Sequence, residues 1–220
     1  MPVDLYFFPS SAPCRAVSLA AKLIDVDLNI KNINLNTKDH LTPEFLKDNT
    51  VAIINFTKIC VLSMFSRAII MYLFNKYGKD DSLYPKDAQK RAIVDQMLCF
   101  DMGTLFQRFA AYYRPVIYEG VPFDPEKLKK VEEAIEFFEK MLEVRDAPFA
   151  AGSTITLADA ALIASISSID AIGAVDLSKY QNVNNWFSRC KSAIPDYEGI
   201  NGGGIAAFRQ RGDVERRNNY

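Results

Sequence analysis

Histidine is almost absent from this chain, and its few cysteines lie far apart. His40 is the only histidine, and no cysteine or acidic residue stands at a spacing from it that is typical of a metal site. Cys14, Cys60, Cys99 and Cys190 form no CxxC pair. We therefore expect no metal centre, and we expect the cysteines to be reduced thiols in a cytoplasmic protein.

The chain also lacks an excess of charge and a long apolar run. Its 26 basic and 27 acidic residues give a formal net charge of -1, so we expect neither nucleic acid nor an acidic membrane surface as a partner. No apolar segment reaches the length of a membrane span, and no signal peptide pattern is present. Since 49% of the 220 residues are hydrophobic, the chain can build one large core or two small ones.

What is present begins with alternating strand and helix patterns. Short apolar runs that end at turn residues predict strands, and apolar residues three and four apart predict helices. The expected strands are residues 4–8, 28–35, 51–56 and 59–63, the last two split by Thr57 and Lys58, and the expected helices begin at Pro13, Pro43 and Ser66. If a helix connects the first two strands, they are parallel.

After residue 86 the pattern is helical to the end of the chain. A helix over 87–113 is expected to end at Pro115, a second is amphipathic over 125–144, and Thr156-x-x-Asp159 resembles a capping box. Further turns are expected at the proline and glycines Pro195, Gly199 and Gly202–Gly204. The expected units are a domain over 1–78, a polar linker over 79–86, a helical domain over 87–208 and a frayed polar tail over 209–220.

Two serines precede the first helix, and each has two interpretations. Ser10 or Ser11 can cap the helix by accepting a backbone hydrogen bond. Either hydroxyl can instead contact a ligand bound over the positive end of the same helix. The residues alone leave both interpretations open.

Several longer strings resemble the cytosolic glutathione transferases, in particular the insect delta and epsilon classes. They are LYFFPSSAPCRAVSLAAK, HLTPEFLKDN, SRAIIMYL, FDMGTLFQRFAAYYRP, TITLADAAL and NVNNWFSRCKSAIPDYE. The resemblance covers essentially the whole chain. It implies an α/β thioredoxin-like N-terminal domain, an all-α C-terminal domain and a homodimer, with glutathione as co-substrate.

The resemblance also implies roles for individual residues. Ser11 matches the serine that donates a hydrogen bond to the glutathione sulfur. Residues that remain for glutathione binding are Ser11, His40, Ile54, Ser66 and Arg67. An apolar second pocket would be lined by Phe106, Phe109, Tyr113, Ile205 and Phe208, although ordinary helix packing explains such aromatic residues equally well.

The chain departs from the family pattern between its second and third expected helices. Ala52 stands in place of a histidine, Asn55 in place of a cis-proline and Phe65 in place of a glutamate. In the family, the glutamate and the adjacent serine hold the γ-glutamyl end of glutathione. Loss of one partner of a desolvated charge pair costs about 2–5 kcal/mol. A trans peptide bond before Asn55 is expected, since a cis bond before a residue other than proline costs about 3–4 kcal/mol.

Two hypotheses follow. In the first, the glutathione site is degenerate, conjugation is weak or absent, and the protein binds a small apolar ligand or another protein. In the second, Ser11, Ser66, Arg67 and backbone groups suffice for an active transferase that conjugates electrophilic xenobiotics. A thiol role for Cys14, beside Arg15 and a helix start, is a third, minor possibility.

Overall fold

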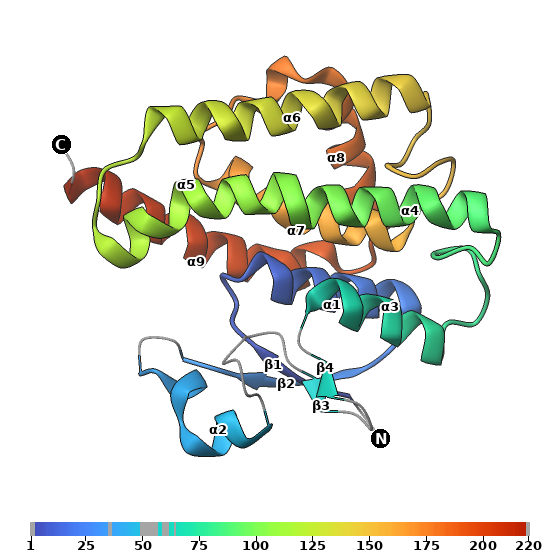
Figure 1. The fold of residues 1–220 in the computed structure, drawn as a ribbon, viewed down its shortest axis with the longest axis horizontal. Coiled ribbons are helices and arrows are strands. Elements are labelled where there is room, and N and C mark those ends of the chain that lie inside the picture. The colour runs from blue at the N-terminus through green and yellow to red at the C-terminus, as the bar shows by residue number, and fades with distance from the viewer. Residues whose placement is uncertain (1–2, 35–36, 49–56, 59–61, 64, 219–220) are drawn as a thin grey trace.

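The computed structural model describes residues 3–34, 37–48, 57–58, 62–63 and 65–218 (Figure 1). The strands are β1 (Val3–Phe7), β2 (Leu28–Asn32), β3 (Thr57–Lys58) and β4 (Leu62–Ser63). The α-helices are α1 (Ala12–Ile24), α2 (Pro43–Asp48), α3 (Ser66–Tyr77), α4 (Ala88–Phe100), α5 (Phe106–Glu119), α6 (Pro125–Arg145), α7 (Leu157–Ala171), α8 (Gln181–Ala193) and α9 (Tyr197–Asn218). Short 3-10 helices span Asp39–Leu41 and Leu177–Lys179, and a π-helical segment, Asp101–Leu105, joins α4 to α5.

The described strands form one sheet in the order β2-β1-β3-β4. β1 and β2 are parallel, as expected for strands connected by a helix, with Val3 opposite Leu28. β3 is antiparallel to both β1 and β4. Thr57 and Lys58, expected to separate two strands, themselves form β3, because they pair with Leu5 and Asp4 of β1. The expected strand at 51–56 lies outside the described residues.

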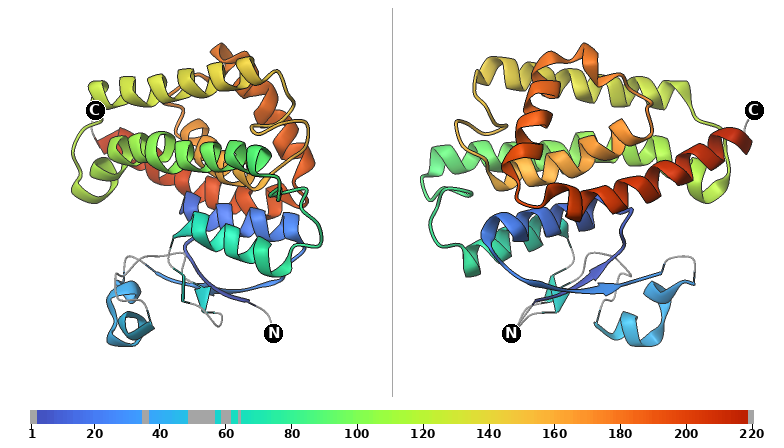
Figure 2. Two further views of the ribbon diagram at one scale, coloured as in Figure 1. Left: turned by 45° about the vertical axis from the view of Figure 1, so that its right-hand side comes forward. Right: turned by 180° about the vertical axis from the view of Figure 1, so that it is seen from behind.

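The helices α1 and α3 form a layer between the sheet and the helices α4 to α9 (Figures 1 and 2). α2 lies on the other side of the sheet region, away from α1 and α3 (Figure 2). The first expected unit therefore meets the helical unit through α1 and α3. Residues 79–86, the expected linker, form no helix or strand.

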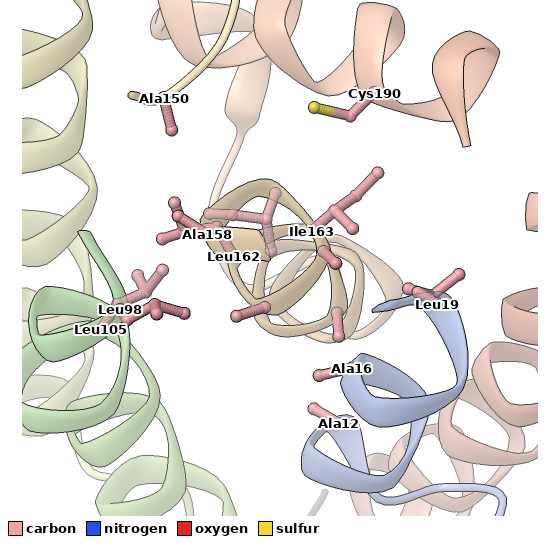
Figure 3. Close-up of a cluster of buried hydrophobic side chains, with 14 of the residues drawn as sticks. Ala12, Ala16, Leu19, Leu98, Leu105, Ala150, Ala158, Leu162, Ile163 and Cys190 are labelled. Carbon is pink, nitrogen blue, oxygen red and sulfur yellow. The ribbon is translucent and has the colours of Figure 1, made fainter. Parts of the chain in front are cut away.

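The contact between α1 and α7 dominates the core (Figure 3). Ala12, Ala16 and Ala20 are buried on α1, and small side chains let two helix backbones approach closely. α7 is buried on nearly its whole circumference, as expected for a helix that is apolar all round. Burial of this extent makes α7 the central helix of the structure. None of the described helices is both long enough and apolar enough to cross a membrane.

Side-chain caps fix where several helices begin. Ser11 caps α1, and the backbone N–H of Phe45 donates to Thr42 Oγ1 at the start of α2. The expected capping box is present at α7, where the backbone N–H of Thr156 donates to Asp159 at 2.8 Å. Asp159 also accepts hydrogen bonds from the Trp186 indole and the Ala150 backbone, so this carboxylate connects α7 to α8 and to the preceding loop.

Two predictions from turn-forming residues are wrong, although Pro195 lies in a turn as expected. Pro115 lies inside α5 instead of ending it, and the helix continues to Gly120, whose φ of 67° suits its role as the cap. Gly199 and Gly202–Gly204 lie inside α9. α9 also continues to Asn218, so most of the segment expected to fray is helical. Packing of these helices against the core outweighs the local preference of proline and glycine, each of which disfavours a helix interior.

Candidate functional site

A cavity of about 110 Å³ lies between the N-terminus of α1, the helix α5 and the helix α9. We call it the Ser11 cavity. Its lining combines a turn with two serines, aromatic rings and one arginine. The lining residues are Phe8, Ser10, Ser11, Ala12, Pro13, Phe106, Phe109, Ala110, Tyr113, Arg114, Ile117, Tyr118, Ser168 and Phe208.

Ser11 serves as helix cap and as cavity wall at once. Its Oγ accepts a hydrogen bond from the backbone N–H of Cys14 at 3.4 Å, and its own N–H donates to the Phe8 carbonyl at 2.9 Å. A serine hydroxyl that accepts one hydrogen bond keeps its proton for another acceptor. The two interpretations of Ser11 are therefore compatible, because the capping residue can still donate to a ligand atom in the cavity.

Four of the five expected pocket residues line the Ser11 cavity together. Phe109 stacks on Tyr113 with ring centroids 5.7 Å apart, and Tyr113 stacks on Phe208 at 4.3 Å. Phe106 completes the set, but Ile205 is not part of the lining and instead packs, partly buried, against the core. Residues from α5 and α9 thus form an aromatic wall next to Ser11.

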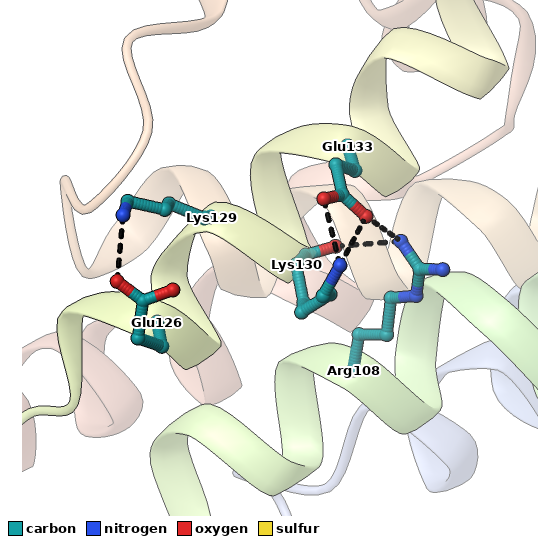
Figure 4. Close-up of polar contacts among 5 residues, drawn as sticks. All are labelled: Arg108, Glu126, Lys129, Lys130 and Glu133. Carbon is teal, nitrogen blue, oxygen red and sulfur yellow. Dashed lines mark hydrogen bonds and ion pairs between the residues drawn. The ribbon is translucent and has the colours of Figure 1, made fainter.

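The opposite face of α5 is held against α6 by polar contacts (Figure 4). Arg108 Nη1 donates to the Lys130 carbonyl at 3.0 Å and pairs with Glu133 Oε2 at 3.2 Å. Lys130 pairs with the same carboxylate at 2.8 Å. These contacts point away from the Ser11 cavity, so Arg108 offers a matched comparison for arginines that line it.

A wider hollow of about 750 Å³ adjoins the cavity and shares part of its wall. Phe106 and Arg114 line both spaces, and the Arg114 guanidinium lies 5.8 Å from the centre of the Phe106 ring. Phe65 and Met102 line only the hollow, where they are 59% and 49% exposed. Both are large apolar side chains on the surface, so the hollow presents an apolar face to solvent.

The charged side chain in the first turn of α3, Arg67, lies inside the protein. Arg67 is buried, forms an ion pair with Asp101, and donates to Ser66 Oγ at 2.6 Å. Burial lowers the pKa of Arg67 to about 10, which leaves it charged at neutral pH. Phe65 occupies the cap position of this helix and makes no side-chain hydrogen bond there. Ser66 and Arg67 were both expected to bind glutathione. In this structure they contact each other, and the Arg67–Asp101 ion pair joins α3 to the π-helical segment after α4.

The remaining expected residues do not join the Ser11 cavity in the described structure. His40 lies half-buried in the 3-10 helix that precedes α2, and its Nδ1 has no hydrogen-bond partner among the described residues. Ile54, Ala52 and Asn55 lie outside the described residues, as does the peptide bond before Asn55. Of the three departures from the family pattern, Ala52, Asn55 and Phe65, the structure therefore describes only Phe65.

A low-pKa thiol at Cys14 is contradicted by its surroundings. Cys14 is completely buried, and burial raises the pKa of its thiol, outweighing the hydrogen bond with Ser11 and the nearby Arg15 charge. The thiolate is the reactive form of cysteine, and a raised pKa keeps the thiol protonated at neutral pH. Cys14 is therefore a packing residue of α1.

Sequence patterns missed Arg15, Ser168 and Arg114. Arg15 follows the capping serine by four residues, which reads as an ordinary position of α1, and Ser168 lies in an apolar run of α7. Only Arg114 had a usable signal, since it lies one and two turns from Ala110 and Phe106 on the same face of α5. Within the described ranges, no group of three or more His, Cys, Asp or Glu side chains could hold a metal ion.

Comparisons with known proteins agree with this architecture. Residues 104–193 match the family model described as the glutathione S-transferase C-terminal domain. A delta-class glutathione transferase of Nilaparvata lugens is 47% identical, with a TM-score of 0.93, 97% of this chain and 100% of that chain covered. A Bombyx mori glutathione transferase is 39% identical, with a TM-score of 0.91 and coverage of 96% and 98%.

A glutathione transferase homologue of Drosophila mojavensis, solved with bound glutathione, is 33% identical, with a TM-score of 0.90 and 97% of each chain covered. All three matches extend over nearly the whole chain. The chain therefore belongs to the glutathione S-transferase family and is similar to the insect delta and epsilon classes.

Proposed function

We propose that this protein binds a small apolar ligand in the Ser11 cavity and conjugates glutathione weakly or not at all. The observation that carries the proposal is Phe65. This side chain is 59% exposed at the cap position of α3, where the family pattern has a glutamate. A phenyl ring offers the ammonium of glutathione no carboxylate, and a missing partner in such a pair costs about 2–5 kcal/mol.

The neighbouring arginine does not compensate for this loss. Arg67 is committed to Asp101 inside the protein, and Ser66 Oγ already accepts a hydrogen bond from Arg67. The sequence adds Ala52 and Asn55, which replace a histidine and a proline of the family pattern. The cavity next to Ser11, by contrast, keeps its aromatic wall. The lost glutathione contacts and the retained aromatic wall together favour binding of apolar ligands over binding of glutathione.

The second candidate function is conjugation of electrophilic compounds with glutathione. Ser11 favours it, because its hydroxyl lines the same cavity as the aromatic rings that would hold an electrophile. In this reaction the glutathione thiol loses its proton, the sulfur bonds to the electrophilic carbon, and the leaving group departs with the electron pair. The Drosophila mojavensis homologue was solved with glutathione bound. Members of this family typically form dimers, and we propose a cytoplasmic homodimer for this protein.

The Phe65→Glu variant tests the first proposal by restoring the missing acid. We expect calorimetry to show that glutathione binds at least about tenfold more tightly to this variant than to the wild type, because a carboxylate at this position pairs with the ammonium. Met102→Glu is the matched control, since it adds the same charge to the same hollow but not at the α3 N-terminus. Equal glutathione affinity of the wild type and Phe65→Glu, with ordinary turnover in both, favours the second candidate.

A further inference from the structure

A second cavity, of about 350 Å³, lies between the C-terminal half of α1, the strand β2 and the start of α9. We call it the α1–α9 cavity, because these two helices pack together beside it (Figure 2). Its lining residues are Phe7, Ser18, Ala21, Lys22, Val26, Asp27, Leu28, Ile30, Asp196, Gly199 and Ile200. None of them lines the Ser11 cavity. The volume is within the range of roughly 300–1,000 Å³ that is usual for small-molecule sites.

The walls of the α1–α9 cavity are mainly apolar, and one of them is open to solvent. Leu28 and Ile30 lie opposite Val3 and Leu5 of β1, and paired residues of neighbouring strands share one face of a sheet. Val3 and Leu5 are buried, so this face is the one that meets the core. Ile30 is nevertheless 41% exposed, because β2 is at an edge of the described sheet. An apolar ligand in the cavity would cover this side chain.

The charged residues of the lining carry a negative excess. Asp27 and Asp196 supply two carboxylates and Lys22 supplies one ammonium, and all three residues are exposed. None of the three has an ion pair within the described part of the chain. Lys22 also lies near Asp25, outside the cavity, where Lys79 chiefly and Lys22 to a smaller degree lower the pKa of the Asp25 carboxyl. The charge of Lys22 is thus shared with a carboxylate that does not line the cavity.

The helix ends at the cavity do not reverse this sign. The C-terminus of α1 and the N-terminus of α9 carry opposite partial charges, which roughly cancel. Asp196 directly precedes α9, and its φ of 55° is a conformation that aspartate tolerates better than most residues. A Cβ on Gly199 would clash with the Asp196 carboxylate, so the glycine leaves room for this carboxylate beside the first turn of α9. The side chains therefore decide the charge of the cavity.

We propose that the α1–α9 cavity binds a small aromatic amine in its protonated form, with the ring against Ile30 and Ile200 and the ammonium near Asp27 and Asp196. The site is separate from the Ser11 cavity, so this inference goes beyond the function proposed above and does not depend on it. The apolar walls provide the surface for the ring. The two carboxylates add a modest attraction for the ammonium, since both are exposed.

Tryptamine and tryptophol provide a matched pair of probes, because they share an indole ring on a two-carbon chain and differ in ending with an ammonium or a hydroxyl. NMR titration of the full chain with labelled isoleucine methyl groups locates each probe. Ile30 and Ile200 report on the α1–α9 cavity, and Ile117 reports on the Ser11 cavity. We expect both probes to shift the signals of Ile30 and Ile200, with tryptamine binding about fivefold more tightly.

The preference for tryptamine should depend on salt and on the two carboxylates. In 1 M salt, where the screening length is about 3 Å, it should fall below about twofold. Asp27→Asn and Asp196→Asn should each reduce it by about twofold and leave the affinity for tryptophol unchanged. Ile30→Ala should instead weaken both probes to a similar extent, because it removes apolar contact surface. Asp170→Asn, which changes an exposed carboxylate of α7 outside the lining, is the matched control and should alter neither affinity.

The three isoleucine signals distinguish this inference from the proposed function. Shifts of Ile117 without shifts of Ile30 and Ile200 would assign both probes to the Ser11 cavity, which overturns the inference but supports ligand binding there. Absence of any shift at Ile30 and Ile200 overturns it as well. Equal binding of the two probes at Ile30 and Ile200, or a preference that survives replacement of both carboxylates, would show that the cavity does not select a cation.

Discussion

The N-termini of α1 and α3 carry the same residue types but differ in what those residues contact. Ser11 caps α1 through the Cys14 N–H and also lines the Ser11 cavity. Ser66, at the first position of α3, accepts a hydrogen bond from its neighbour Arg67, and the cap position before it is the apolar Phe65. Ser11 matches the serine of the family pattern at one helix end, and Phe65 stands in place of its glutamate at the other.

The two buried arginines near these helix ends show the same contrast in charge. Arg67 is neutralised inside the protein by Asp101, whereas the acceptors of Arg15 are neutral. A guanidinium paired with an internal carboxylate attracts a ligand anion only weakly. A guanidinium without one favours an anion nearby. The α3 end therefore contains an internal ion pair that the α1 end lacks.

Removing the counter-charge of Arg67 should have the largest effect on stability. Asp101→Asn leaves a buried guanidinium unpaired, and loss of one partner of a buried ion pair costs about 3–5 kcal/mol. Urea unfolding of the variant measures this loss. Asp95→Asn, on the preceding helix α4, is the control, because an asparagine can still accept the hydrogen bond from Tyr84. A cost below about 1 kcal/mol for Asp101→Asn would show that the two arginines do not differ as described.

Removing a neutral partner of Arg15 should have a smaller effect. Asn201→Ala deletes the acceptor of Arg15 Nε and the donor to Tyr197 Oη. Hydrogen bonds to charged groups contribute about 1.5–3 kcal/mol, so the free energy of unfolding should fall by that amount. Asn185→Ala, at an exposed position of α8, should change it by less than about 0.5 kcal/mol. If Asn201→Ala costs as much as Asp101→Asn, a neutral acceptor and a carboxylate are equivalent here.

The cap position of α3 should give the smallest effect, and a favourable one. Phe65→Ser should be more stable than Phe65→Ala by about 1 kcal/mol, because a serine there can accept a backbone N–H of the first turn as Ser11 does in α1. The alanine variant controls for loss of the exposed ring. Thermal unfolding of the pair measures the difference. Equal stability would mean that the α3 end is already satisfied without a cap.

The sequence predicted those parts of the fold that depend on local patterns. The helices α1 and α6, the parallel pair β1 and β2, and the capping box at Thr156 were all anticipated, because period and capping residues specify them. The resemblance supplied the rest of the architecture. Four of the five expected aromatic pocket residues meet at the Ser11 cavity.

What the sequence did not predict depends on contacts between distant residues. The glycines of α9 suggest turns, yet Gly204 is helical and its missing side chain lets α9 reach the Pro9 carbonyl. Arg15 donates to Ser168, which lies 153 positions later in the chain. No local pattern reports that an arginine of a short helix is buried without an acid. Such features appear only when the helices are packed together.

Calorimetric titration of the wild-type protein with glutathione tests the central claim most directly, with conjugation of a standard aryl halide measured alongside. The proposed loss of glutathione recognition at Phe65 predicts no saturable heat up to millimolar glutathione and no conjugation above the uncatalysed rate. Micromolar binding of glutathione, together with turnover that disappears in Ser11→Ala, would contradict it and establish an active transferase.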